Sequence, residues 1–206
     1  MQIGNLNKNW QMVIERTDLP GTDKYAKVSV LECRRCGLEY GANGQDVWER
    51  KCPSCDKGRP GLAVPPHTVW LQYWKRAQIS REVGRGVLNH SGGDQLARVE
   101  VGDVVWIVGK GVTDVLVTIG PIRVGEISSS EREVERRLGY KPWDARWHIL
   151  ADPELCEVPL EVSLDGILLR LRFDSKRSPT LSIDSGVPLG QRLQAMRRLT
   201  NESARL

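Results

Sequence analysis

The sequence predicts an α+β protein that is mostly β: a small module held by cysteines, then a partly open β-barrel with helical decorations. Three observations support this prediction. Two CxxC pairs lie close together near the N-terminus of the 206-residue chain. Short apolar runs follow, separated by Gly, Pro and Asp, as in strands joined by turns. Only two later segments show the capping residues or the apolar spacing of a helix.

The cysteine pairs have the spacing of a metal site. Cys33 and Cys36 form the first pair, Cys52 and Cys55 the second, and fifteen residues separate the pairs. Two such knuckles match a tetrahedral site of four thiolates, so we expect one structural zinc ion per chain. No position is left open for water, which predicts no catalysis at the metal. Two independent redox pairs are the alternative.

The rest of the first module is expected to be strands and turns. Residues 10–18 and 24–30 read as strands around a turn, and the GANG segment 41–44 reads as a hairpin tip. Residues 56–66 are rich in Gly and Pro and read as a linker. We therefore predict two domains, residues 1–64 with the zinc ribbon and its N-terminal strands, and residues 65–206.

The second domain is expected to contain mainly short strands. The strands are apolar runs bounded by turn residues, at 68–74, 102–109, 115–127 (a pair turned at Gly120-Pro121), 147–150 and 156–164. Residues 128–139 read as a helix with Ser130 and Glu133 as a capping box and Gly139 at its end. A second helix is expected at 189–199, where Leu189, Leu193, Met196 and Leu199 share one face. Cys156 reads as a buried strand thiol.

One segment of this domain resembles the EVE branch of the PUA-like superfamily. The family shows a Gly-Val-x-Asn, then Leu, an apolar residue and Gly-Asp at fixed offsets. The matching residues here are Gly86, Val87, Asn89, Leu96, Val99, Gly102 and Asp103. The resemblance covers about residues 67–206, with Val69-Trp70-Leu71 as the first strand and 169–173 and 193–200 as the ending. One departure is Gly84, which stands where the family has Trp.

The resemblance implies a nucleic-acid reader with no catalytic activity. PUA-like domains bind nucleic acids, and several take a flipped or modified base into an aromatic pocket. We therefore expect recognition of a modified base, with DNA favoured over RNA, as the specificity part of a restriction or defence system. A nuclease or other effector would then be the protein partner.

Each part of such a site has candidate residues. A flipped base needs a stacking surface, contacts to its edge, and cations for the phosphates. The expected base-pocket residues are Asn89, Trp70, Trp74, Trp106 and Trp147. The expected phosphate-binding residues are Lys75, Arg76, Arg81 and Arg85, in what reads as a loop region. Arg34 and Arg35 could extend this surface.

Charge and targeting signals bound the location and the partners. The net charge is only +4, so a nucleic-acid surface must be a local patch. No apolar run approaches the ~18 residues that span a bilayer, and no signal peptide is seen. Paired CxxC knuckles suit a reducing compartment, so we expect a cytoplasmic protein with no membrane partner.

Three other functions remain open. The chain could be an RNA-binding PUA-like protein. It could be an adaptor whose zinc ribbon docks a partner protein. It could also be a nuclease of the HNH type, because such enzymes combine zinc knuckles with a catalytic His and His90 lies in a faintly similar segment. His90 is, however, 35 residues past Cys55, and the residues after it read as barrel.

Overall fold

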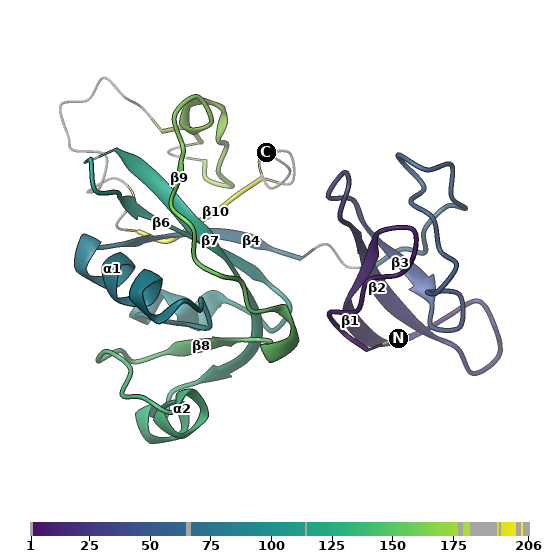
Figure 1. Ribbon diagram of the computed structural model, residues 1–206, viewed down its shortest axis with the longest axis horizontal. Coiled ribbons are helices and arrows are strands. Elements are labelled where there is room, and N and C mark those ends of the chain that lie inside the picture. Colours follow the sequence, from purple (N-terminus) through teal and green to yellow (C-terminus); the bar gives the residue numbers. More distant parts are fainter. Residues whose placement is uncertain are drawn as a thin grey trace. The chain divides into compact units, whose positions relative to one another are not determined.

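The computed structural model describes residues 2–64, 67–113, 115–176, 179–181, 193, 195–200 and 203. The chain forms two compact units, Met1–Pro66 and His67–Leu206 (Figure 1). We call the first the cysteine unit and the second the sheet unit. Strands dominate both, and the described residues form two α-helices, α1 (Arg76–Arg85) and α2 (Glu131–Leu138). The predicted α+β, mostly β class is confirmed.

The cysteine unit is built on a small antiparallel sheet. Its strands are β1 (Gln11–Pro20), β2 (Lys27–Cys33) and β3 (Glu39–Asn43), in the order β1-β2-β3. The strands expected at 10–18 and 24–30 are thus confirmed. A small core cluster covers the sheet and consists of Val13, Leu31, Tyr40, Ala42 and Val47.

The predicted hairpin tip at 41–44 is wrong. Gly41, Ala42 and Asn43 belong to β3 and pair with β2, and the turn between β2 and β3 is the first cysteine knuckle. Gly41 is needed because the backbone of Leu62 comes close: a Cβ at Gly41 would lie 2.8 Å from the Leu62 carbonyl oxygen. Gly41 and Leu62 exchange two backbone hydrogen bonds of 2.8 and 3.0 Å. Part of the expected linker is therefore a strand partner of β3.

The sheet unit carries a mixed seven-stranded sheet in the order β10-β4-β6-β7-β8-β5, with β9 paired to β7. The strands are β4 (Val69–Trp74), β5 (His90–Gly92), β6 (Val104–Lys110), β7 (Leu116–Ser128), β8 (His148–Ala151), β9 (Val162–Ser163) and β10 (Arg197–Arg198). The short 3-10 helices are Asp94–Arg98, Pro153–Leu155 and Leu168–Arg170. Strands β4 and β6 run parallel, and β7 pairs with β6 in its first half and with β8 in its second. This long strand joins the two parts of the sheet (Figure 1).

Strand β7 corrects the expected turn at Gly120-Pro121. The chain does not reverse there, because β7 continues for 13 residues from Leu116 to Ser128. Gly120 has a φ of 123°, and the register with β6 shifts between Ile107 and Val108. A glycine in this conformation lets a strand bend without ending.

The expected loop at 75–85 is the helix α1. Its inner face buries Ile79 and Glu82, and Gly86 ends it with a φ of 72° while its N–H bonds the Glu82 and Val83 carbonyls. Ile79 packs closely on β6, because a Cβ at Gly109 would lie 2.4 Å from the Ile79 side chain. Ile79 is the one fully buried apolar residue of the helix, so the sequence shows no apolar periodicity from which the helix could be predicted.

The chain end was also assigned wrongly. Arg197 and Arg198 form strand β10, which pairs with Leu71 and Trp70 of β4, in place of the expected helix at 189–199. Leu193, Met196 and Leu199 are buried as predicted, and Leu189 lies outside the described residues. The apolar spacing therefore identified core residues correctly but not their backbone conformation.

Local signals near α2 gave a correct prediction. The Ser130 hydroxyl accepts a hydrogen bond from the Glu133 N–H at 3.4 Å, and Gly139 ends the helix with a φ of 73°. Neither α-helix of the described chain is long and apolar enough to cross a membrane.

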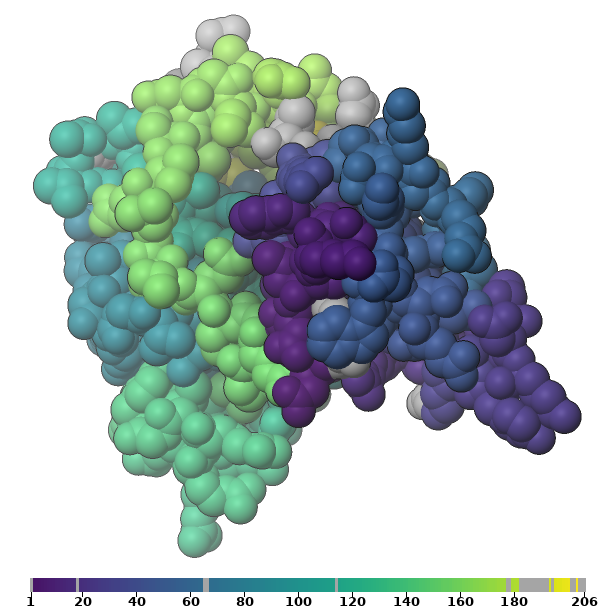
Figure 2. Space-filling view, turned by 45° about the vertical axis from the view of Figure 1, so that its right-hand side comes forward, coloured from purple at the N-terminus to yellow at the C-terminus, as the bar shows by residue number. Residues whose placement is uncertain are grey.

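The segment after β8 is mostly irregular. It runs across the outside of the sheet unit, green in Figure 2, and only Val162–Ser163 of the expected strand 156–164 is a strand. Cys156 is half-buried and its thiol donates to the Asp152 carbonyl at 3.5 Å. It therefore packs at the edge of the core and not within a strand.

Asp103 explains the Gly-Asp pair found in the sequence. Its carboxylate is 7% exposed and accepts from the Trp70 indole at 2.8 Å and from the backbone N–H groups of Thr68 and Glu100 at 3.0 Å each. Gly102 supplies a φ of 94° just before it. The pair thus ties the start of β4 to the start of β6.

We expect Asp103→Ala to destabilise the sheet unit by about 3 kcal/mol, because it leaves the buried Trp70 indole N–H and two partly buried backbone N–H groups without their acceptor. Urea denaturation and hydrogen exchange of the β6 amides would measure the loss. Asp165→Ala removes an exposed carboxylate of the same unit and should change stability by less than about 0.5 kcal/mol. Equal effects of the two substitutions would contradict this role.

Candidate functional site

The four cysteine sulfurs converge on one point. All lie within 4.8 Å of one another, with Cys33 to Cys55 and Cys36 to Cys52 both at 3.6 Å. Zinc–sulfur bonds of ~2.3 Å in a tetrahedron would place the sulfurs about 3.8 Å apart. Cys33 and Cys52 are buried, whereas Cys36 and Cys55 are exposed. The group is thus consistent with one bound metal ion.

Two tight turns bring the sulfurs together. At the end of β2, the N–H groups of Cys36 and Gly37 both bond the Cys33 carbonyl, at 3.3 and 2.8 Å, and Gly37 has a φ of 71°. In the second knuckle the Gly58 N–H bonds the Cys52 carbonyl at 2.9 Å. Each turn therefore directs two sulfurs toward the same point.

A buried glutamine supports the site, which the sequence did not suggest. The Gln11 side chain is fully buried and donates to the Cys33 sulfur at 3.5 Å. The Tyr40 hydroxyl donates to the other end of the same amide at 3.0 Å. Such outer hydrogen bonds orient metal ligands and hold them in place.

The thiols cannot all ionise without a cation. Burial works against ionisation of Cys33, yet hydrogen bonds from Gln11 and from the backbone of Arg35 and Cys36 outweigh it and lower its pKa to about 6. The pKa of Cys55 is raised to about 12, first by its hydrogen bond with Cys33. The lowered pKa of Cys33 favours the thiolate, which is the form that binds a metal ion.

Two of the four expected pocket tryptophans lie in the core. Trp70 and Trp74 are 7% and 1% exposed, and their indole N–H groups donate to Asp103 and to the Ser91 hydroxyl. Neither offers an open face for stacking without a rearrangement of the core. Trp106 and Trp147 are half-buried.

Asn89 lies at a more accessible place. It is half-buried just before β5, and its side-chain oxygen accepts from the Tyr140 hydroxyl at 3.0 Å. Its carbonyl accepts from the Ala151 N–H at 2.9 Å, which fixes the backbone. Within the part of the chain that the structure describes, no hydrogen bond leaves the Asn89 amide nitrogen, so this donor remains available.

The four expected phosphate-binding cations lie in or next to α1. Lys75 and Arg81 are exposed, whereas Arg76 pairs with Glu161 at 2.5 Å. Arg85 pairs with Glu82 and lies over the Tyr140 ring, 3.7 Å from its centre. The helix thus presents two exposed cations and places a third against the aromatic ring beside Asn89.

Three titratable side chains of α1, β5 and β8 are fully buried, and of these only His90 was singled out from the sequence, as a possible nuclease residue. Glu82 is fully buried, and burial raises its pKa although Arg85 lowers it. His90 and His148 are also fully buried and share a hydrogen bond of 3.0 Å between His90 Nε2 and His148 Nδ1. Among the described residues, the outer nitrogens of both rings and Glu82 Oε2 have no partner. In the sequence these residues stand out only as polar residues next to short apolar runs. Exposed loops show the same pattern, so the sequence did not predict that they are buried.

Comparisons with known proteins do not assign a family. No family model matches the chain, and no curated protein matches its sequence. What the structure shows is the four-cysteine cluster near the N-terminus followed by a mixed β-sheet domain.

We expect His90 to remain uncharged well below neutral pH. Burial, then the charges of His148 and Arg85, lower its pKa to about 3. In the unfolded chain the imidazole binds a proton near the ordinary histidine pKa of 6.5, so stability is full above that pH. Below that pH, the free energy of unfolding should fall by about 1.4 kcal/mol per pH unit as the pH drops toward 3. Nitrogen NMR of the ring would check this, and a midpoint near 6.5 would contradict it.

Proposed function

We propose that this protein is a zinc-stabilised nucleic-acid reader. In this proposal the cysteine unit is a zinc ribbon, and the sheet unit is a PUA-like domain of the EVE type. That domain binds a flipped, modified base, in DNA rather than RNA. The observation that carries the proposal is Asn89, whose oxygen is fixed by Tyr140 and whose amide nitrogen donates to none of the described residues.

Zinc is the metal that suits the cysteine group best. Four thiolates in a tetrahedron are a donor set that zinc prefers, whereas magnesium and calcium prefer oxygen. The protein fills all four positions, so the ion stabilises the fold and does not act on a substrate. The presence of an outer hydrogen bond from Gln11 to Cys33 supports a permanent site.

The stack of Arg85 on Tyr140 is the best candidate for the wall of the base pocket. Bases stack on aromatic rings and on guanidinium planes, and both are present here at 3.7 Å from each other. Both residues are half-buried, so the stack can be reached from solvent. The core positions of Trp70 and Trp74 favour this stack over those indoles as the wall.

The roles of the parts then follow from their chemistry. An amide held at its oxygen has one defined orientation, so its N–H groups can select an acceptor on a base edge. Arg81 is exposed on the same helix as Arg85, and Lys75 is exposed directly before that helix. Both can contact phosphates, which position the strand without reading its sequence.

We expect one zinc ion per chain in purified protein. Removing it with a chelator should unfold the cysteine unit and leave the sheet unit folded, because the two units have separate cores.

Cys52→Ser should have the same effect as the chelator, and Gln11→Ala should weaken zinc retention about tenfold to a hundredfold. Ser54→Ala, in the same knuckle, is the matched control. Elemental analysis giving less than half an equivalent would overturn the zinc assignment.

We expect Tyr140→Ala to weaken binding of modified oligonucleotides about tenfold to a hundredfold, since a stacking surface contributes ~1–3 kcal/mol per base. Tyr140→Phe keeps the ring but removes the hydrogen bond that orients the Asn89 amide. It should therefore reduce the preference between bases more than the affinity, and Asn89→Ala should have the same effect. Fluorescence anisotropy with DNA and RNA oligonucleotides, methylated, hydroxymethylated or unmodified, would measure both.

Tyr73→Phe is the matched control, because Tyr73 is half-buried on β4 and packs on the other core cluster. It should bind like the parent protein. Tighter binding of RNA than of every DNA would replace the DNA proposal by the RNA alternative. Identical base preferences in the parent and Asn89→Ala proteins would remove Asn89 from the site.

A further inference from the structure

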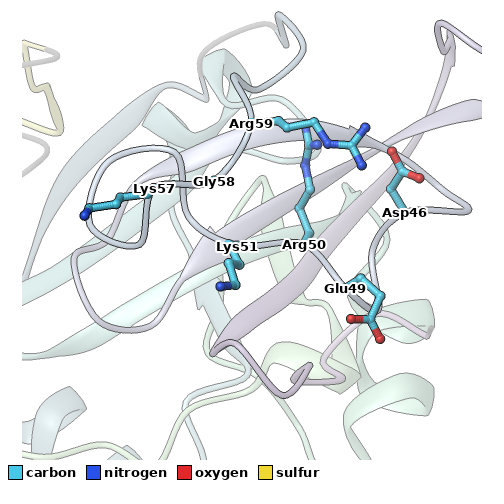
Figure 3. A pocket seen from close by; sticks show the side chains of 7 residues that line it. All are labelled: Asp46, Glu49, Arg50, Lys51, Lys57, Gly58 and Arg59. Carbon is cyan, nitrogen blue, oxygen red and sulfur yellow. The ribbon is translucent and has the colours of Figure 1, made fainter.

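A basic hollow lies on the cysteine unit, beside the second knuckle. It has a volume of about 210 Å³ and is shown in Figure 3. Four cations and two carboxylates line it: Arg50, Lys51, Lys57, Arg59, Asp46 and Glu49. Glu49 already pairs with Lys8 at 2.6 Å, which leaves the positive charges in excess.

Arg50 makes the hollow more than a group of surface cations. It is only 9% exposed, and its Nη2 donates to the Pro60 carbonyl at 2.9 Å. Its Nε lies buried without a partner among the described residues. An anion bound beside this guanidinium would supply an acceptor that the described residues do not provide. In Figure 3 its side chain extends toward Arg59.

The backbone of the knuckle fixes the cations that surround Arg50. Lys57 has a φ of 50°, and a Cβ at Gly58 would lie 2.0 Å from the Lys51 carbonyl oxygen, so only glycine fits there. The Gly58 N–H bonds the Cys52 carbonyl at 2.9 Å. The same turn therefore positions a cysteine ligand and the cations Lys51, Lys57 and Arg59.

Exposed indoles occur in the same unit. Trp48, two residues before Arg50, is 57% exposed, and Trp10 is 50% exposed. The side chains of Asn7 and Asn9 tie the N-terminal turn to the segment that holds Trp48, through bonds of 3.0 and 3.2 Å to the Arg50 carbonyl. Neither indole lines the hollow itself, but Trp48 directly precedes the Glu49-Arg50-Lys51 segment that does. Proteins that bind single strands typically combine a cationic surface with exposed aromatic faces.

We propose that this hollow is a phosphate subsite for a nucleic-acid strand, whose bases stack on Trp48. It does not overlap the Asn89 site, and it needs no particular base. It rests on the proposed function only in that the ligand is a nucleic acid. An acidic protein segment would match the charge but would leave the two exposed indoles without a role.

The test uses the zinc-loaded full chain, a short single-stranded oligothymidylate and a titration of salt. On a single strand each lost phosphate contact reduces the salt slope by about 0.7, so Lys57→Ala/Arg59→Ala should lower it by about 1.4. Affinity near physiological salt should fall at least tenfold. Trp48→Ala should lower affinity about tenfold with the slope unchanged. On binding, the NMR signal of the Arg50 Nε–H should shift.

Arg16→Ala/Lys24→Ala removes the same charge from exposed positions of β1 and the β1–β2 turn, and it should leave affinity within about twofold. Zinc content and the cysteine-unit NMR spectrum confirm that each variant is folded. An unchanged slope in Lys57→Ala/Arg59→Ala overturns the proposal. Equal binding of oligoglutamate, lost in the same variant, also overturns it in favour of an acidic protein partner. Asn89→Ala should leave oligothymidylate binding here intact, so failure of the base reader and failure of this subsite are distinguishable.

Discussion

The convergence of four sulfurs within 4.8 Å is the constraint on which the cysteine unit depends. Its apolar core is small, with Val13, Leu31 and Tyr40 as the main members, and such a core does not offset the entropy of ordering some sixty residues. Four thiolates at this distance repel one another unless a cation lies between them. A bound metal turns that repulsion into attraction and fixes both knuckles, together with the basic turn that follows Cys52.

The sheet unit depends on polar groups buried at strand ends. Asp103 joins β4 to β6, and its three donors satisfy both carboxylate oxygens. Glu82 and the His90–His148 pair differ, because they are fully buried and leave three side-chain atoms without partners among the described residues. Unpaired buried polar atoms are costly in a core of this kind. His90 directly follows Asn89, and Glu82 pairs with Arg85, so these costs are understandable if the proposed base site serves binding rather than stability.

Local chemistry was readable from the sequence, and long-range pairing was not. The Ser130 cap depends on neighbours within a few residues and was predicted correctly, and the cysteine spacing correctly predicted that the four sulfurs come together. The GANG segment has the composition of a turn, yet pairing with β2 makes it a strand. Arg197 and Arg198 likewise form a strand only because β4 offers an edge, more than 120 residues earlier in the sequence. Propensity and periodicity cannot supply partners that distant.

The proposed base site also combines a local sequence signal with a long-range contact that the sequence does not show. Asn89 came from a short sequence register, but Tyr140, which holds it, is 51 residues away and no pattern linked the two. The resemblance to the EVE branch placed an aromatic at Gly84, where a Cβ would meet nothing within 4 Å. This open position is one residue before Arg85, whose guanidinium lies on the Tyr140 ring. In the proposed base site, Tyr140 from the segment after α2 therefore supplies the aromatic surface that the resemblance leads one to expect at position 84. A base entering there would meet a planar surface and an oriented amide, so the missing Trp does not by itself argue against recognition.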